Sequence, residues 1–131
     1  MDACQRGRPG GPEAAIYVYN EGKEDYAQVF AQLTQRAGNF LVSREEEPDF
    51  QWSDLERKSV IGGRLGGMPE MVLEYVIKEN GMTIGKDMEI INNIDFTSTA
   101  GAFLGEVGDY TVEFEPFATT LEMEGCGTVV A

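Results

Sequence analysis

A glycine-rich stretch, residues 62–67 with the sequence Gly-Gly-Arg-Leu-Gly-Gly, is where the residue types point most directly to chemistry. It lies between a short β-prone run, residues 59–61, and an apolar-periodic segment that begins at Met68. Glycines let backbone N–H groups approach a ligand closely, and a helix N-terminus adds a partial positive charge there. The stretch indicates a binding turn for an anionic or polar group. An equally weighted alternative is that the glycines only form a tight turn between a strand and a helix.

The turn matches neither of the phosphate loops that place glycines between a strand and a helix. A Walker A loop would end in Gly-Lys-Ser/Thr, but here the last two glycines are followed by Met68 and Pro69. A dinucleotide fingerprint needs glycine at its third position, which Arg64 occupies. The sequence therefore argues against nucleotide binding. Glu70, in the first turn of the expected helix, already partly satisfies the helix dipole.

The sequence contains no histidine, and this excludes a large part of enzyme chemistry. A Ser-His-Asp triad, a Cys-His dyad and every His-containing zinc site are ruled out. Cys4 and Cys126 have no metal-ligand spacing around them. Glu113 and Glu115 have strand spacing that puts both on one face, but without a partner group a solvated or ligand-facing pair is favoured over acid–base work. We expect no enzyme activity, no cofactor and no metal site.

Length and charge narrow the class of protein. With 131 residues, 42% of them hydrophobic, the chain is long enough for one domain with a real core. Its formal charge of −13 argues against nucleic acids, whose binding depends on Lys and Arg, and disfavours anionic membranes. No apolar run reaches the roughly 18 to 20 residues of a membrane span. Residues 1–11 lack the apolar centre of a signal peptide, so the chain as written is expected in the cytoplasm.

The elements that must position the glycine turn alternate between strand and helix from residue 58 onward. The segment from Met68 carries apolar residues at the i, i+3, i+4, i+7 and i+8 positions of an amphipathic helix, and Gly81 is placed to end it. The remaining pattern predicts strands at 59–61, 88–92, 110–114 and 127–131 and helices at 95–104 and 116–124, with Asp95 or Thr97 as the cap of the first. This order predicts a three-layer α/β fold, in which helices flank a mostly parallel sheet.

The first third of the sequence has a different character. Residues 1–11 are polar, Gly-rich and locally basic, and we expect them to form a disordered tail. Pro12 suits the first position of a helix of about two turns. Residues 26–34 and 40–43 are β-prone and flank a turn-forming stretch, which predicts a hairpin or a strand pair. The expected parts are residues 12–47 and 48–131, with Phe50, Trp52 and Leu55 pinning a short turn onto the body of the second.

Helix N-termini recur at residues 11–13, 95–97 and 115–117, each after an expected strand end or turn. In a parallel sheet such N-termini gather at the carboxyl edge, where ligands usually bind. An aromatic residue at such a place is on its own about twice as often core packing as a ligand wall. The candidate ligand-binding residues are Gly11, Pro12, Glu13, Arg64, Gly66, Gly67, Met68, Pro69, Phe96, Thr97 and Glu115.

Several stretches resemble solute-binding proteins of ABC importers. They are residues 11–20 (Gly-Pro-Glu-Ala-Ala-Ile-Tyr-Val-Tyr-Asn), 30–34 (Phe-Ala-Gln-Leu-Thr), 61–71 (Ile-Gly-Gly-Arg, then Gly-Gly-Met-Pro-Glu-Met) and 114–116 (Phe-Glu-Pro). The similar group is the one related to nitrate-, sulfonate- and taurine-binding proteins and to the thiamine-precursor (NMT1/THI5-like) family. The resemblance runs from about Gly11 to the C-terminus, and its motifs are specific as a series.

The resemblance implies a lobe of the type II periplasmic-binding-protein fold. Members of the group have two α/β lobes that close on a ligand, and this chain is similar to the end of the first lobe and most of the second. We therefore expect a truncated chain from a two-lobe parent. Gly11, Pro12 and Glu13 would lie on the first-lobe side of the cleft, and the other candidates on the second-lobe side. The parent would be extracytoplasmic, periplasmic or lipid-anchored, and would deliver a small organic or anionic ligand to a membrane permease.

Two other interpretations stay open. A lobe without its partner exposes apolar surface and strand edges around residues 26–43, which predicts a homodimer through exposed strands. A stand-alone dimerising interaction module with no ligand would use that surface instead of the glycine turn. An enzyme ranks third, because no set of Glu, Asp, Tyr, Lys, Ser and Cys has a recognisable spacing. The pyrimidine synthases of the same broad family consume an active-site histidine, which this sequence lacks.

Overall fold

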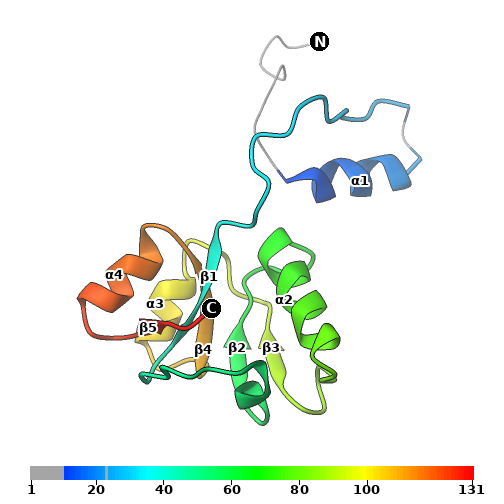
Figure 1. Ribbon diagram of the computed structural model, residues 1–131. Coiled ribbons are helices and arrows are strands. Elements are labelled where there is room, and N and C mark those ends of the chain that lie inside the picture. The colour runs from blue at the N-terminus through cyan, green and yellow to red at the C-terminus, as the bar shows by residue number, and fades with distance from the viewer. Residues whose placement is uncertain (1–10, 23) are drawn as a thin grey trace. The chain divides into compact units, whose positions relative to one another are not determined.

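The computed structural model describes residues 11–22 and 24–131 (Figure 1). The chain divides into two compact units, Met1–Gln35 and Arg36–Ala131, which we call the N-terminal unit and the C-terminal unit. The predicted disordered tail lies outside the described residues except for Gly11. Gly11 is exposed and directly precedes the first helix.

The described part of the N-terminal unit contains the helix α1 (Pro12–Asn20). Pro12 stands at the first helical position, and Glu13 places a carboxylate in the first turn, where it favours the helix dipole. The helix ends where the Glu21 N–H donates to Tyr17 O at 3.1 Å and Gly22 adopts a φ of 71°. The predicted short helix is therefore confirmed.

The predicted strand at residues 26–34 is wrong, because these residues form neither helix nor strand. The strand expected to pair with them, β1 (Asn39–Ser43), has β4 on one side and β5 on the other. β4 pairs with β1 along its whole length and β5 pairs with Val42 and Ser43, so these two residues have no free edge for the predicted hairpin. The apolar side chains of the segment are left exposed, namely Tyr26, Val29, Phe30 and Leu33.

Five strands form one sheet in the C-terminal unit, in the order β3-β2-β4-β1-β5. Besides β1, they are β2 (Ser59–Ile61), β3 (Glu89–Ile91), β4 (Tyr110–Phe114) and β5 (Thr128–Val129). β2 is parallel to β3 and to β4, whereas β1 is antiparallel to β4 and to β5. β1 therefore runs against the other four strands, and the predicted mostly parallel sheet is confirmed.

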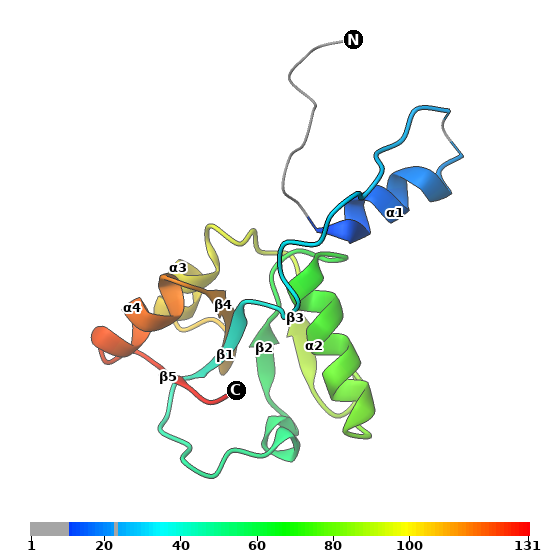
Figure 2. The same ribbon diagram turned by 45° about the horizontal axis from the view of Figure 1, so that its top comes forward.

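Helices cover both faces of this sheet, as Figures 1 and 2 show. On one face, α2 (Met68–Glu79) packs Leu73 into a core that includes Val60. On the other, α3 (Thr99–Leu104) and α4 (Phe117–Met123) pack Phe103 and Leu121 into a core that includes Ile61. Val60 and Ile61 are neighbours in β2, and successive strand residues point to opposite faces. The predicted three-layer α/β fold is confirmed.

The third helix begins at Thr99 and not at Asp95 as predicted. Residues 95–98 form a turn in which the Ser98 N–H donates to Asp95 O at 2.8 Å. Ser98 is the residue before the helix and makes no capping hydrogen bond with its side chain, so the predicted caps Asp95 and Thr97 are wrong. The turn leaves the Phe96 side chain outside the helix, where it packs against the glycines after β2.

Side chains hold the connection between β1 and β2 onto the sheet. The short 3₁₀ helix η2 (Trp52–Leu55) buries Leu55 completely, and the rings of Phe50 and Trp52 pack edge-to-face at 5.4 Å. The Tyr110 hydroxyl donates to the Glu47 carboxylate, whose two oxygens lie at 2.7 and 3.0 Å. The prediction that Phe50, Trp52 and Leu55 pin a turn onto the body is confirmed.

Candidate functional site

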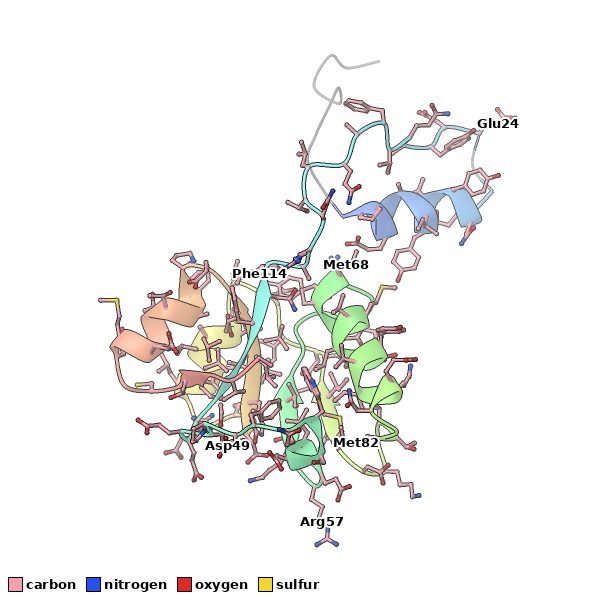
Figure 3. All side chains as sticks on the ribbon, viewed as in Figure 1. Glu24, Asp49, Arg57, Met68, Met82 and Phe114 are labelled. Atoms are coloured by element: carbon pink, nitrogen blue, oxygen red, sulfur yellow. The ribbon has the colours of Figure 1, made fainter. Side chains whose placement is uncertain are left out.

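The carboxyl ends of β2, β3 and β4 lie at one edge of the sheet, because these three strands are parallel. We call it the carboxyl edge, and Figure 3 shows Met68 and Phe114 at this end of the unit. Ligands of open α/β sheets bind at such edges. The predicted candidates of the C-terminal unit all follow one of the three strands: Arg64, Gly66, Gly67, Met68, Pro69, Phe96, Thr97 and Glu115.

Residues 62–67, which we call the glycine loop, are hydrogen-bonded to the last residue of β3 and to the residue after it. The Gly62 N–H donates to Ile91 O at 2.9 Å, and the Leu65 N–H donates to Asn92 O at 3.0 Å. Within the loop, the Gly67 N–H donates to Arg64 O at 3.0 Å, while the Arg64 side chain is exposed. The loop therefore has a defined shape set by its own backbone and by the end of β3.

The glycines of this loop make room for an aromatic ring. The Phe96 ring occupies the space that a Cβ at Gly63 would need, and its Cζ lies 3.2 Å from the position of a Cβ at Gly67. Phe96 also packs edge-to-face on Phe114, with the ring centroids 5.8 Å apart. Thr97 follows Phe96 in the sequence and is exposed. The structure thus brings Phe96 together with the glycine loop.

Glu70 connects the start of α2 to two other segments of the edge. It is buried, with 2% of its surface exposed. Its Oε2 accepts a hydrogen bond from the Gly66 N–H at 3.1 Å, and its Oε1 accepts one from the Asn92 side-chain amide at 3.5 Å. Sequence reasoning noted Glu70 only as a charge in the first helical turn and missed Asn92. No local signal identifies Asn92, because its partner lies in a different element.

Glu113 is a second buried carboxyl group at this edge, with 2% of its surface exposed. Burial raises the pKa of Glu113, although hydrogen bonds from the Thr111 and Thr99 hydroxyls oppose the shift. The Thr99 hydroxyl lies 3.0 Å from Phe96 O and 3.1 Å from Glu113 Oε2, so it connects the turn before α3 to β4.

The expected pairing of Glu113 with Glu115 on one strand face is wrong. β4 ends at Phe114, so Glu115 lies beyond the strand and does not follow its alternation. The Glu115 carboxylate instead accepts hydrogen bonds from the Thr119 N–H at 3.2 Å and from the Thr119 hydroxyl at 2.9 Å. It therefore holds the first turn of α4, and the two acids serve different partners.

The remaining candidates, Gly11, Pro12 and Glu13, belong to the N-terminal unit. Gly11 precedes α1 in an extended conformation, and the Glu13 carboxylate folds back against Gly11. Gly11 and Glu13 therefore lie at the N-terminus of α1, as the sequence predicts. That these three residues share one site with the carboxyl edge stays a prediction.

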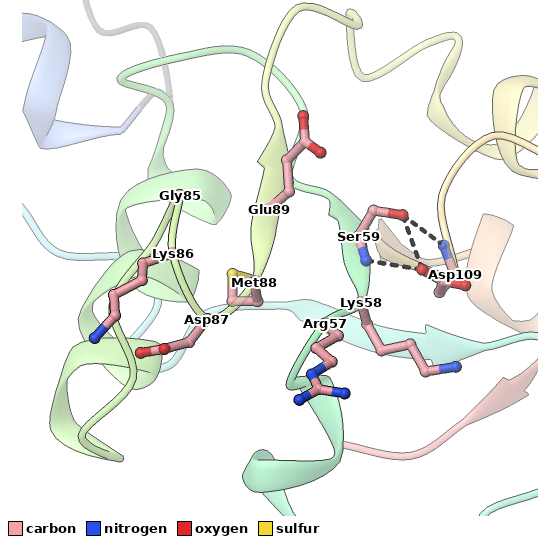
Figure 4. Close-up of a pocket in the computed structure, with 9 residues that line it drawn as sticks. All are labelled: Arg57, Lys58, Ser59, Gly85, Lys86, Asp87, Met88, Glu89 and Asp109. Atoms are coloured by element: carbon pink, nitrogen blue, oxygen red, sulfur yellow. Dashed lines mark hydrogen bonds between the residues drawn. The ribbon is translucent and has the colours of Figure 1, made fainter.

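The opposite edge of the sheet carries a hollow of about 540 Å³, beside the amino ends of β2, β3 and β4 (Figure 4). The Asp109 carboxylate accepts hydrogen bonds there from the Ser59 N–H at 2.8 Å and the Ser59 hydroxyl at 2.9 Å. Burial alone would raise the pKa of Asp109, but these bonds outweigh it and hold the pKa below its usual value. The charged residues that line the hollow are Arg57, Lys58, Lys86, Asp87, Glu89 and Asp109. Because three are basic and three are acidic, the hollow has no net positive or negative character.

The fold is that of solute-binding proteins. The structure is similar to the periplasmic aliphatic sulphonate binding protein SsuA from Escherichia coli, with a TM-score of 0.58 and 16% identity over 70% of this chain and 31% of that one. The alkanesulfonate-binding protein SsuA from Xanthomonas axonopodis pv. citri, bound to MOPS, has a TM-score of 0.59 and 16% identity over 72% and 32% of the two chains. A protein of Bordetella bronchiseptica RB50 has a TM-score of 0.65 and 15% identity over 90% and 37%.

A sequence relative is a Bacillus subtilis (strain 168) protein named "Putative binding protein YtlA". It is 46% identical over 121 residues, which make up 92% of this chain and 36% of the relative. The chain thus spans about a third of the length of the proteins it matches. No protein-family model matches the sequence. The relative and both SsuA proteins carry the names of binding proteins and not of enzymes.

None of the helices in the described ranges has the length and apolar character that a membrane crossing requires.

Proposed function

We propose that this chain is a ligand-binding lobe of an ABC-importer solute-binding protein, and that it binds a small organic or anionic solute at the carboxyl edge. The observation that carries the proposal is the glycine loop at this edge in a fold shared with sulfonate-binding proteins. Pockets at the carboxyl ends of parallel strands combine apolar walls with a few polar groups. The carboxyl edge has both kinds of residue.

Each candidate has a proposed part in binding. Phe96 supplies an apolar wall, and Thr97 beside it supplies an exposed hydroxyl. Arg64 brings an exposed cation to the rim of the loop. The other candidates lie at the starts of helices, where they would line the site: Gly11, Pro12, Glu13, Gly66, Gly67, Met68, Pro69 and Glu115.

The same proposal extends to the whole protein of which such a lobe is a part. Its location is extracytoplasmic, which the periplasmic E. coli neighbour supports. Its partner is the membrane permease of an ABC importer. Binding without catalysis agrees with the absence of histidine from the sequence.

Thermal unfolding of the chain against a panel of small anions, sulfonates and pyrimidines tests the proposal. A ligand at 100 times its dissociation constant stabilises the folded state by about 2.7 kcal/mol. Gly66→Ala should abolish the stabilisation, because Gly66 has a φ of 73° and a side chain there strains the loop. Gly85→Ala is the matched control, with a φ of 81° at the opposite edge. A shift that survives Gly66→Ala would place the ligand elsewhere.

A second candidate function is a dimerising interaction module, and one observation favours it. Residues 24–35 expose apolar side chains, with Val29 at 65%, Phe30 at 86% and Leu33 at 82% of their surface. Such exposure typically marks a surface that binds another protein. In this case Phe30→Asp would reduce the mass seen by light scattering from dimer to monomer, and Gly66→Ala would leave the mass unchanged. A monomeric wild type would exclude this candidate.

A further inference from the structure

We propose that the peptide bond between Phe30 and Ala31 is a proteolytic processing site, cut by an endopeptidase whose specificity pocket takes an aromatic side chain. The bond lies in residues 24–38, which we call the connecting segment because they lie between α1 and β1. Three observations carry the proposal. They are the open backbone of the segment, the exposure of the Phe30 side chain, and a hydrophobic core that lies wholly on one side of the bond.

The backbone of the connecting segment is open to an endopeptidase. Every residue from 24 to 38 is exposed, and none belongs to a helix or a strand (Figure 1). Within the described part of the chain, the segment takes part in no hydrogen bond between two backbone groups. Its sequence contains no proline, so every residue in it carries a backbone N–H. A partner can therefore bind the segment as an added strand, and exposed loops are the usual sites of proteolytic nicking.

The Phe30 side chain selects the bond within this segment. It is 86% exposed, more than any other large apolar side chain in the described residues. No charged residue lies between positions 26 and 35. A hydrophobic slot of the chymotrypsin type takes an aromatic side chain on the carbonyl side of the bond that is cut. With the Phe30 ring in such a slot, the carbonyl group of Phe30 is the one that is attacked.

The neighbouring apolar side chains fit this role less well. Tyr26 is 41% exposed, and its ring packs edge-to-face on Tyr19 with 5.2 Å between the centroids. Leu33 is 82% exposed but is not aromatic. The carbonyl oxygen of Thr34, the next residue, accepts a hydrogen bond from the Gln32 side chain at 2.9 Å. An endopeptidase with an aromatic pocket should therefore cut at the proposed bond first.

Hydrolysis of the bond adds one water molecule. The carbonyl carbon of Phe30 takes the oxygen and becomes a carboxylate, and the nitrogen of Ala31 leaves as a new amino terminus. Both hydrophobic clusters of the described chain consist of residues 40 or later, and α1 buries no residue. The fragment that begins at Ala31 therefore keeps the whole core. The cut also separates the candidates at residues 11–13 from those of the carboxyl edge.

Limited proteolysis of the full chain with chymotrypsin tests the proposal, with the products identified by their intact masses. Phe30→Gln removes the aromatic side chain, whereas Ala31→Pro keeps it and places a proline ring at the bond. Tyr75→Gln is the matched control, because Tyr75 is an aromatic residue that is 63% exposed but lies in α2. Trypsin is the second enzyme, since Arg36 lies in the same segment and its cleavage does not depend on Phe30.

The wild type should first give two fragments, residues 1–30 and 31–131, and the second should resist further cutting. Phe30→Gln and Ala31→Pro should slow this cut by about tenfold or more, because each disturbs the fit of the bond to the protease. Tyr75→Gln should be cut at the wild-type rate, because the hydrogen-bonded backbone of a helix does not enter a protease cleft. Trypsin should cut all four proteins after Arg36 at the same rate, which would show that the variants leave the segment open.

A first chymotryptic cut in the C-terminal unit, an unchanged rate for Phe30→Gln, or a chain that neither enzyme cuts would overturn the proposal. Cutting by trypsin after Arg36 without a chymotryptic cut after Phe30 would do the same, because the segment would then be open without presenting this side chain. A rate of cutting that falls as the protein concentration rises would mean that a second copy covers the segment. That result would favour the dimerising module and would also overturn the processing site.

Discussion

The ring of Phe96 lies in the space that a side chain at Gly63 would occupy. Gly63 has a φ of 83°, in the left-handed region that glycine adopts readily. A residue that follows β3 therefore closes over the loop that follows β2. This contact, together with the hydrogen bonds from the loop to Ile91 and Asn92, sets the shape of the carboxyl edge.

Gly63→Ala should lower the free energy of unfolding by about 2 kcal/mol, because a Cβ there adds backbone strain and displaces the Phe96 ring. Gly85→Ala is the control. Gly85 has a similar φ of 81° but has open space around it, so its substitution adds the strain alone. Urea unfolding measures both losses. Equal losses in the two variants would mean that the Phe96 ring moves aside without cost.

Glu113 should make the chain less stable as the pH rises. Burial raises the pKa of Glu113 above its ordinary value of 4.5, so the folded chain keeps a proton that the unfolded chain has lost. This stability is fully present below the unfolded pKa and is lost as the pH rises through the folded pKa. Glu113→Gln cannot ionise and should flatten the decline in the free energy of unfolding as the pH rises above about 4.5.

Glu89→Gln is the control for this pH dependence, because Glu89 is an exposed acid on β3 and its substitution should leave the decline in place. Urea unfolding at a series of pH values gives the slope for each protein. A Glu113→Gln variant with the slope of the wild type would contradict the role of Glu113.

Arg44 fastens the segment after α3 to the sheet. Its guanidinium donates to Phe103 O at 2.6 Å, Val107 O at 2.9 Å and Gly108 O at 2.8 Å, and lies 4.0 Å from the centre of the Phe103 ring. Arg44→Lys should lower the free energy of unfolding by about 2 kcal/mol, because an ammonium keeps the charge but not the planar fork. The exposed Arg57 gives the control, and Arg57→Lys should change stability by less than about 0.5 kcal/mol. Thermal unfolding that does not separate the two variants would count against this role.

Tyr110→Phe should loosen the connection between β1 and β2 by removing the hydrogen bond to Glu47, at a cost of about 1 kcal/mol. Burial raises the pKa of Tyr110, and the bond to Glu47 raises it further, so the hydroxyl keeps its proton into alkaline solution. Faster hydrogen exchange of the amides in residues 47–55 would report the loosening. Tyr75→Phe, on the exposed face of α2, should leave these amides unchanged.

Local patterns predicted the elements whose signals lie within one segment. The apolar repeat from Met68 predicted the helix α2, and Gly81 adopts a φ of 77° just after the helix ends. The face predicted by that repeat is wrong, because α2 buries Leu73 and Ile77 and leaves Met71 and Tyr75 exposed. Pro12 marked the start of α1 in the same way. In each case the cause is short-range, since it depends on residues less than two turns away.

Contacts between distant segments could not be predicted from such patterns. Residues 26–34 have a β-prone composition, but a strand also needs a partner, and β4 and β5 already flank β1. The third helix starts late because residues 95–98 turn to pack Phe96 on the glycine loop. The bond between Asn92 and Glu70 joins two elements that no sequence period relates. The edge of the sheet was therefore predictable, and the contacts that shape it were not.

The position of β1 in the sheet determines when the protein can fold during its synthesis. β1 pairs with β4 through Ser43 and Tyr110, and with β5 through Ser43 and Thr128. The ribosome makes β1 before both of its partners. The pairing of β1 therefore forms only after residues 110–129 are made, and such non-local pairing is slow. Until then the nascent chain carries a β-prone segment that can aggregate, so its survival in the cell depends on chaperones or on rapid completion.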